Sequence, residues 1–185
     1  MLSTQSDDSE IFQAFLNTNT KHKAFEILFD KYAKKLYWVA RRIVINHDDA
    51  DDVMQNTWIK IWNNLSGFKE ESKLYTWLYK ITTNESLLML QKKKQNLSID
   101  DYQETLSNQL QAGVYFNGNK VQLALQQAVL QLPEKQRLVF NLKYFENMKY
   151  EDMEKILDTS IGALKASYHH AVKKVEEILK TNLNV

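Results

Sequence analysis

Apolar residues recur every three or four positions in several long stretches of this chain, a spacing typical of amphipathic helices packed around a core. The first stretch predicts a helix over 24–43, with the apolar positions Phe25, Leu28, Phe29, Tyr32, Leu36, Val39 and Ile43. A second stripe consists of Ala50, Val53, Met54, Thr57, Trp58, Ile61 and Leu65, and a third of Leu74, Trp77, Leu78, Ile81, Glu85 and Leu88. We therefore expect three helices here, with room for a short helix before them.

Polar segments between the stripes predict where these helices begin and end. We expect His47-Asp48-Asp49 to form a turn and cap, because acids near a helix N-terminus interact favourably with its dipole. Residues 66–71 are predicted to be a loop, with Ser72 as the N-cap of the third helix.

The stretch 95–120 is polar and contains Gly113 and the turn-like pair Asn117-Gly118, so we interpret it as a linker. Its apolar residues, such as Leu106, Leu110 and Phe116, are unusual for a free tether and are candidates for docking on a partner or a domain. The predicted organisation is a first helical domain over 1–94, a linker over 95–120 and a second helical domain over 121–185.

The second domain has the pattern of a helix-turn-helix. Leu132-Pro133-Glu134 predicts a helix start with proline at the first position. Asp158-Thr159-Ser160 predicts a tight turn, with Asp158 in a left-handed backbone conformation and Ser160 as an N-cap. A short helix, a tight turn and a longer helix form the layout whose second helix can enter a DNA major groove.

Composition supports an all-α chain of the cytoplasm. The 185 residues include four glycines, one proline and no cysteine, so few residues break helices and no thiolate metal site exists. No run of apolar residues is long enough to span a membrane, and the N-terminus lacks the pattern of a secretory signal. The histidines have no metal-ligand spacing, and we expect neither a metal nor another cofactor.

The net charge is +1, but charges of each sign are segregated. The second predicted helix gathers polar residues on one side: Asp51, Asp52, Gln55, Asn56, Lys60 and Asn63. Such a face suits a basic protein partner, and the alternative is a solvated helix surface.

The third predicted helix combines aromatic and basic residues. Tyr75, Trp77 and Tyr79 cannot all face one core, because neighbours two apart lie on different sides of a helix. Rings beside Lys80 and Asn84 could stack on unpaired bases, and the run 92–94 of lysines could hold phosphates. The alternative places Trp77 in the core.

The last predicted helix offers a modest DNA-reading face. Its outward candidates are Gly162, Lys165, Ala166, His169 and His170, with Ser160 at its cap.

Three blocks, in this order, resemble the extracytoplasmic-function (ECF) sigma factors of bacterial RNA polymerase. Residues 49–62 (DADDVMQNTWIKIW) are similar to the polymerase-binding segment, residues 76–84 (TWLYKITTN) to the promoter-melting segment, and residues 132–140 (LPEKQRLVF) to the entry of the C-terminal DNA-binding domain. The resemblance covers nearly the whole chain and implies a sigma factor that performs no covalent chemistry.

The resemblance also implies partners and site residues. Core RNA polymerase would be bound by Asp51, Asp52, Gln55, Asn56 and Trp58. The loop 66–73 would hold a flipped base of the −10 element, and the −10 contacts would be Phe68, Trp77, Lys80, Asn84, Lys92 and Lys93. The −35 duplex would be read by Ser160, Gly162, Lys165, Ala166, His169 and His170. An inhibitory anti-sigma factor is a further implied partner.

The chain departs from the family pattern at several positions. Asn56 replaces a frequent acid, and Thr83 and Gln91 replace frequent arginines. Ser167 and His170 stand where basic residues are common in the recognition helix. Two rival functions are a helix-turn-helix regulator that acts without polymerase and a helical adaptor that binds only protein.

Overall fold

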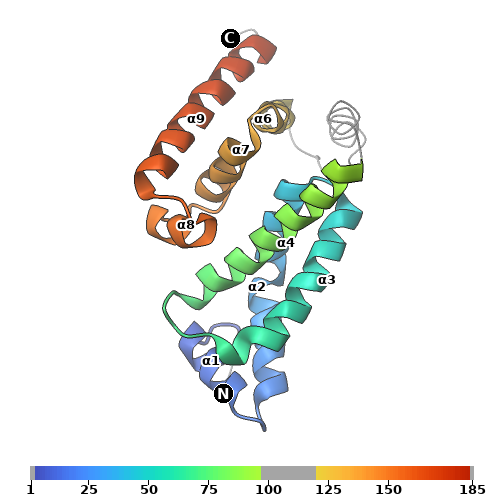
Figure 1. The fold of residues 1–185 in the computed structure, drawn as a ribbon, viewed down its shortest axis with the longest axis vertical. Helices are drawn as coiled ribbons and strands as arrows, with labels where there is room; N and C mark the ends of the chain where they lie inside the picture. Colours follow the sequence, from blue (N-terminus) through green and yellow to red (C-terminus); the bar gives the residue numbers. More distant parts are fainter. Residues whose placement is uncertain (1–2, 97–119, 184–185) are drawn as a thin grey trace. The chain divides into compact units, whose positions relative to one another are not determined.

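The computed structural model describes residues 3–96 and 120–183, and every regular element within those ranges is a helix (Figure 1). The all-α prediction is confirmed. The elements are α1 (Asp8–Leu16), α2 (Lys21–Val44), α3 (His47–Asn64), η1 (Leu65–Gly67), α4 (Leu74–Asn96), α6 (Lys120–Leu130), α7 (Glu134–Phe140), η2 (Asn141–Phe145), α8 (Tyr150–Leu157) and α9 (Ile161–Leu183).

The chain divides into two compact units, Met1–Gln91 and Lys92–Val185. The predicted linker over 95–120 lies mostly outside the described residues, and so do its apolar residues at 106, 110 and 116. Helix α4 continues to Asn96 and α6 begins at Lys120, so each helix reaches into one end of the predicted linker. No helix among the described residues is both long enough and apolar enough to cross a membrane.

The short helix expected before the first stripe is present as α1. It begins with a capping box, in which the Asp7 carboxylate accepts from the Asp8 N–H at 2.8 Å and the Glu10 carboxylate accepts from the Asp7 N–H at 3.3 Å. Ile11, Phe12 and Phe15 form its buried face, so α1 packs on α2 through apolar contacts.

A polar cluster also attaches α1 to α2. The Tyr32 hydroxyl lies 2.6 and 2.8 Å from the two oxygens of the Asp8 carboxylate. The Lys31 ammonium lies 2.8 Å from the same carboxylate and donates to the Ser6 carbonyl at 2.7 Å. Burial raises the pKa of Tyr32, and the hydrogen bond to Asp8 raises it further.

Tyr32→Phe is expected to lower the free energy of unfolding by about 1–2 kcal/mol at pH 8, because it removes a hydrogen bond to a charged group. The pKa of Tyr32 is higher in the folded protein than the value of about 10 in the unfolded chain. Tyr32 therefore contributes fully to the free energy of unfolding below about pH 10, and this contribution is lost as the pH rises above that value. Urea unfolding at pH 8 and at higher pH checks this. The gap between wild type and variant should narrow in alkali, whereas a constant gap would contradict the assignment. Tyr144→Phe, at a half-exposed ring in the second unit, is the control.

The stripes predicted for α2 and α3 are confirmed with one exception. Leu28, Leu36 and Ile61 are fully buried, and α2 packs along α3. Phe29 was predicted to be part of the core, but it is 43% exposed and its ring lies on Trp58 of α3, with ring centroids 4.8 Å apart. This prediction was wrong because Phe29 lies at the edge of the stripe.

The buried face of α4 is richer in hydroxyl groups than its sequence pattern predicts. The helix begins at Leu74, so Ser72 is not the N-cap; its hydroxyl donates to the Lys73 carbonyl at 3.3 Å. Thr76, Thr82, Thr83 and Ser86 are buried, and Leu88, predicted to be inside, is 46% exposed. The hydroxyls of residues 82 and 86 donate to the carbonyls four residues earlier at 3.0 and 2.8 Å. A helix can therefore bury Thr82 and Ser86 at little cost.

The second unit encloses its own core. Its central buried residues are Ala128, Val129, Leu132, Phe140, Ala171 and Val175. Helix α7 begins at Glu134, so Pro133 occupies the N-cap position rather than the first helical position that the sequence predicted. Arg137 is buried and donates to the Leu130 carbonyl at 3.4 Å, so this guanidinium contributes to the interior of the unit and not to its surface.

The helix-turn-helix prediction is confirmed by α8, a three-residue turn and α9 (Figure 1). Asp158 has φ 49° and ψ 43°, the left-handed conformation expected of it. The Ser160 hydroxyl accepts from the Ala163 N–H at 3.4 Å, and Glu154 accepts from the Ile161 N–H at 3.3 Å. These contacts satisfy N–H groups at the start of α9 that have no partner within the helix.

Candidate functional site

Three exposed surfaces hold the residues that the sequence singled out, and the first is the outer face of α3. Asn46 is the N-cap, and its side chain accepts from the Asp49 N–H at 3.0 Å. Residues 47–49 are therefore the first helical turn, not the turn and cap that we expected. Asp48 lies near the positive end of the helix dipole, whereas Asp49 is buried.

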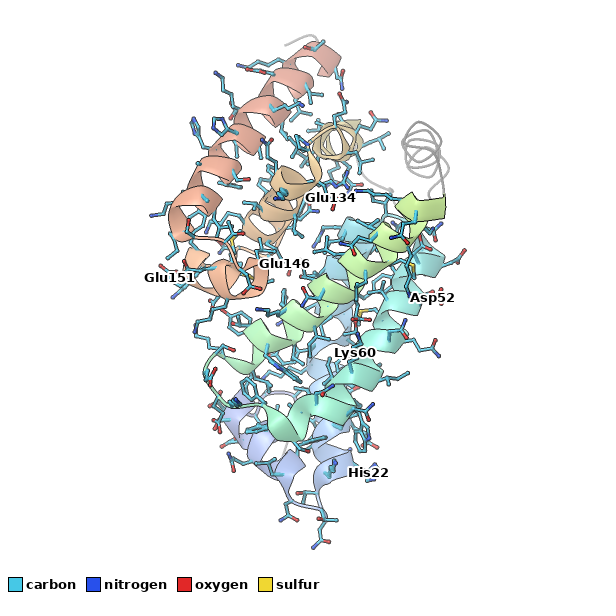
Figure 2. All side chains as sticks on the ribbon, in the orientation of Figure 1. His22, Asp52, Lys60, Glu134, Glu146 and Glu151 are labelled. Carbon is cyan, nitrogen blue, oxygen red and sulfur yellow. The ribbon has the colours of Figure 1, made fainter. Side chains whose placement is uncertain are left out.

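The predicted polar side of α3 faces solvent. Asp51, Asp52, Gln55 and Asn56 are all exposed, and Figure 2 labels Asp52 on this helix. Trp58 is half-buried and continues the same face as an apolar patch. Its ring contacts Phe29 and, at 5.8 Å between ring centroids, Phe25. Carboxylates beside a partly exposed indole are the features of a surface that binds a basic and partly apolar protein.

A histidine connects this face to α2. The Tyr37 hydroxyl lies 2.6 Å from Nδ1 of His47, and Nε2 of the same ring lies 3.6 Å from the Asp51 carboxylate. In the tautomer that accepts from Tyr37, the proton is at Nε2, which points to Asp51. Sequence reasoning did not include Tyr37, His47 or Phe29 among the site residues, because only the packing of α2 against α3 brings them together.

Lys60 has a different role from the other polar residues of α3. It forms an ion pair with Glu85 of α4; Figure 2 labels Lys60 on α3. The Glu85 side chain is only 11% exposed, so its carboxylate requires a cation nearby. The pair fixes α3 and α4 together, and these are the helices of the first and second surfaces.

The second surface comprises the loop before α4 and one side of that helix. Phe68 packs edge-on against Phe12, with ring centroids 5.3 Å apart, and in a tilted arrangement against Trp77, with ring centroids 5.5 Å apart. Trp77 is half-buried, so part of its ring is accessible to solvent. Tyr79 is buried and Tyr75 is half-buried, in agreement with the prediction that Tyr75, Trp77 and Tyr79 do not share one face.

The cations of this surface are on the same helix. Lys80 is half-buried, Asn84 and Lys92 are exposed, and Lys93 is half-buried. Thr83 stands where arginine is frequent in the ECF sigma factors that the sequence resembles. It is fully buried and contributes nothing to this surface. Aromatic rings with lysines and an amide on one helix form a platform suited to unpaired bases.

A cavity of about 250 Å³ opens between the start of α1, the loop before α4 and the first turn of α4. Its lining includes Asp7, Phe12, Phe68, Glu70 and Lys73. Glu70 adopts a positive φ of 56°, which gives the loop a sharp bend at the rim of the cavity. The loop 66–73, expected to hold a flipped base, therefore borders an open space.

The third surface is the outer side of α9. All six predicted residues are exposed there: Ser160, Gly162, Lys165, Ala166, His169 and His170. The Lys165 ammonium lies 5.7 Å from the ring centroid of Tyr150 on α8, and the two histidine rings are 5.9 Å apart. Small residues beside a lysine let a helix approach base edges closely.

The described residues contain no group of three or more histidine, aspartate or glutamate side chains placed to hold a metal ion.

Comparison with known families matches both units. Residues 28–96 match the family model of Sigma-70 region 2, and residues 122–175 match that of Sigma-70 region 4. The first match contains the whole of α3 and α4, and the second contains α8, the turn and most of α9.

Curated relatives and solved structures agree with these matches. The ECF RNA polymerase sigma factor SigW of Bacillus subtilis (strain 168) is 30% identical over 167 residues, covering 85% of this chain and 89% of that protein. The fold is shared with the sigma factor RpoE of Bartonella quintana, solved with the anti-sigma factor NepR, at TM-score 0.68, 23% identity and coverage of 85% and 98%. It is also shared with CnrH, solved with the cytosolic domain of CnrY, at TM-score 0.70, 20% identity and coverage of 94% and 97%.

Proposed function

This chain belongs to the extracytoplasmic-function (ECF) sigma factors of bacterial RNA polymerase, and from that premise we propose how its surfaces divide the work of transcription initiation. As a sigma factor, it binds core RNA polymerase and directs the enzyme to promoters. The observation that carries this conclusion is the succession of a region 2 match and a region 4 match along one chain, each on a helical unit of its own.

The first domain, residues 1–94, binds polymerase through α3. Asp51, Asp52, Gln55 and Asn56 supply acceptors and negative charge, and Trp58 supplies an apolar anchor. The support is their shared exposure on one helix face next to Phe29. Electrostatic complementarity of this kind steers association and fixes the orientation of a partner.

The same domain opens the −10 element through α4 and the loop before it. Phe68 and Trp77 stack against unpaired bases, Lys80 and Asn84 contact the separated strand, and Lys92 and Lys93 hold its phosphates. The cavity beside Phe68 has room for part of a flipped nucleobase. Extruding a base costs a few kcal/mol, which stacking and hydrogen bonding in a shaped pocket offset.

The second domain, residues 121–185, reads the −35 element as duplex DNA. Helix α9 enters the major groove with the exposed side that carries Lys165, Ala166 and His169. Ser160, Gly162 and His170 lie at its borders. The segment 95–120 links the two domains.

The chain itself performs no catalysis in this scheme, and RNA synthesis is the chemistry of the polymerase. Because its partners are bacterial polymerase and promoter DNA, we place the protein in the cytoplasm. One structure that shares its fold is the sigma factor RpoE in complex with the anti-sigma factor NepR, and another is CnrH in complex with the cytosolic domain of CnrY. We therefore include an anti-sigma protein among its partners.

The test combines binding with transcription. Purified chain and core RNA polymerase are expected to co-elute in size exclusion at low salt, and the complex should start RNA synthesis at sites where core enzyme alone does not. Start sites mapped after overexpression supply the promoters.

Each rival function has its own outcome in this test. Folded protein that binds duplex DNA but does not co-elute with core enzyme would favour a helix-turn-helix regulator. Co-elution without initiation at any genomic site would favour an adaptor that binds only protein.

A further inference from the structure

The second half of α2 carries a strongly basic face that the assignments above do not use. Residues 31–44 contain five cations and no carboxylate, in a chain whose overall net charge is +1. The cations are Lys31, Lys34, Lys35, Arg41 and Arg42. The acids of α2, Glu26 and Asp30, both lie in its first half.

These cations lie on one side of the helix. Lys31, Lys35, Trp38 and Arg42 follow one another at steps of four, three and four residues, which places them in one row. Lys34 and Arg41 each precede a member of that row and widen it. The opposite side of the helix, with Leu36, Val39 and Ile43, is buried. Lys34 and Lys35 are exposed on this side, and Lys31, Trp38, Arg41 and Arg42 are half-buried beside them. We call these six residues the α2 basic face.

The central lysines of this face are available to a partner. Lys34 and Lys35 are exposed, and no carboxylate among the described residues forms an ion pair with either. Lys31 differs, because Asp8 neutralises it. Two exposed ammonium groups on adjacent residues repel each other, so binding an anion is favourable there.

Aromatic rings hold the longer side chains of the face. The Lys35 ammonium lies 5.6 Å from the ring centroid of Tyr32, and the Arg42 guanidinium lies 5.8 Å from that of Trp38. Such contacts restrict flexible cations before a partner binds, which reduces the entropy lost on binding. The half-buried Trp38 also gives the face a flat apolar element.

Charge and spacing together favour a nucleic acid over an acidic protein. Positions 34 to 42 extend about 12 Å along the helix axis, which corresponds to three or four nucleotides of one strand at about 3.4 Å each. Positions 34 to 42 contain no carboxylate that would repel a phosphate. The exposed acids of α3 have the opposite sign and are assigned to polymerase, so the α2 basic face remains for the other polymer in the complex.

We propose that the α2 basic face is a second phosphate-binding surface of the first domain, which holds the backbone of promoter DNA through Lys34, Lys35 and Arg42. This inference rests on the proposed sigma function, because it places the DNA in a complex that the acids of α3 anchor. It adds to the −10 contacts of α4 a sequence-independent grip on another helix.

The experiment uses the full chain with core polymerase and a mapped promoter. The variant Lys34→Gln/Lys35→Gln is compared with wild type in promoter binding at a series of salt concentrations. The slope of log affinity against log salt should become shallower by about 0.9 for each lost duplex contact, or about 0.7 for each lost single-strand contact. Affinity at moderate salt should fall about three- to tenfold. Affinity for core polymerase should not change.

Two further variants test whether the effect depends on where the charges are lost, and not on the total charge or on the folding of the chain. Lys23→Gln/Lys180→Gln removes the same net charge at exposed positions outside the face and should leave the slope unchanged. Lys34→Arg/Lys35→Arg keeps the charge and should retain the wild-type slope. Far-UV circular dichroism should show equal helicity in all variants, since exposed lysines contribute little to stability.

Three results would overturn the proposal. The first is an unchanged salt slope of promoter binding in Lys34→Gln/Lys35→Gln, and the second is an equal change of that slope in Lys23→Gln/Lys180→Gln. The third is a loss of affinity of Lys34→Gln/Lys35→Gln for core polymerase, which would make the face a protein-binding surface. Failure of the sigma assignment is distinct, because wild-type protein would then fail to co-elute with core polymerase or to start transcription.

Discussion

Reversing the charge of two exposed acids, Asp51→Lys/Asp52→Lys, is expected to lower affinity for core RNA polymerase about 100-fold. Both side chains are exposed on α3 and lie beyond its first turn. Like charges brought together at an interface cost several kcal/mol, and each 1.4 kcal/mol corresponds to about a tenfold change in affinity. The neutral variant Asp51→Asn/Asp52→Asn should lose less, because it removes attraction without adding repulsion.

Stability should change much less than binding. Exposed charges contribute about 0–1 kcal/mol to folding, and the Asp51 carboxylate lies 3.6 Å from the exposed ring of His47. Urea unfolding should therefore give nearly the wild-type free energy. Competition between labelled wild type and each variant for core polymerase measures the affinities, and the difference should shrink at high salt.

A charge-matched control lies on the neighbouring helix. Glu26→Lys/Asp30→Lys changes the net charge by the same amount at two exposed positions of α2. It should retain most of the core affinity. If the α3 variant binds as wild type does, or if both variants lose affinity equally, the assignment of α3 as the docking helix is wrong.

Helical periodicity was sufficient to predict α2, α3 and the helix-turn-helix. Their stripes combine large apolar residues inside with charged residues outside, so burial follows a period of 3.6. The turn between α8 and α9 was predictable as well, because few non-glycine residues tolerate the left-handed conformation seen at Asp158. The exposed residues of α9 follow from the same period.

Helix α4 shows why the pattern was less informative elsewhere. Thr82 and Ser86 are polar by composition, but their hydroxyls donate to backbone carbonyls of the same helix. These donors are satisfied without any partner from another element, so the residues can be buried. Leu88 is exposed for the complementary reason, since buried hydroxyl residues occupy the side of the helix that leucine would otherwise fill.

The contacts at the site that were missed depend on tertiary packing. Phe29 lies against Trp58, and Tyr37 lies against His47, only because α2 and α3 pack together. The N-cap at Asn46 was missed for a local reason. His47-Asp48-Asp49 has the composition of a cap, and the preceding asparagine was an equally good candidate.

Trp77→Ala is expected to reduce promoter opening about tenfold or more. The ring is half-buried against Phe68, and the rest of it is accessible at the proposed −10 surface. Stacking of a base on an aromatic side chain contributes about 1–3 kcal/mol, which the variant would lose. A fluorescent base analogue in the −10 element reports strand opening directly. Trp77→Phe should retain part of the activity, because a smaller ring can still stack.

Loss of packing must be separated from loss of stacking, because truncating a half-buried tryptophan also destabilises the domain. Trp62→Ala is a suitable control. Trp62 is half-buried in the same domain, with its ring 4.9 Å from Phe25 and 5.6 Å from Phe15 between centroids, and it lies outside the proposed DNA surfaces. Both variants should lower the free energy of unfolding by a similar amount, on the order of 2 kcal/mol, but only Trp77→Ala should impair opening.

A template with a mismatched bubble at the −10 element decides between the two explanations. If Trp77 acts when the strands separate, a template that is already open should restore most of the activity of Trp77→Ala. If the ring acts mainly by supporting Phe68 and the loop, the bubble should not help, because the pocket itself would be disordered. If Trp77→Ala opens duplex promoter DNA normally and has the wild-type free energy of unfolding, Trp77 lies outside the mechanism. A loss of cooperative unfolding would instead assign the ring to the core, as the alternative interpretation of its sequence holds.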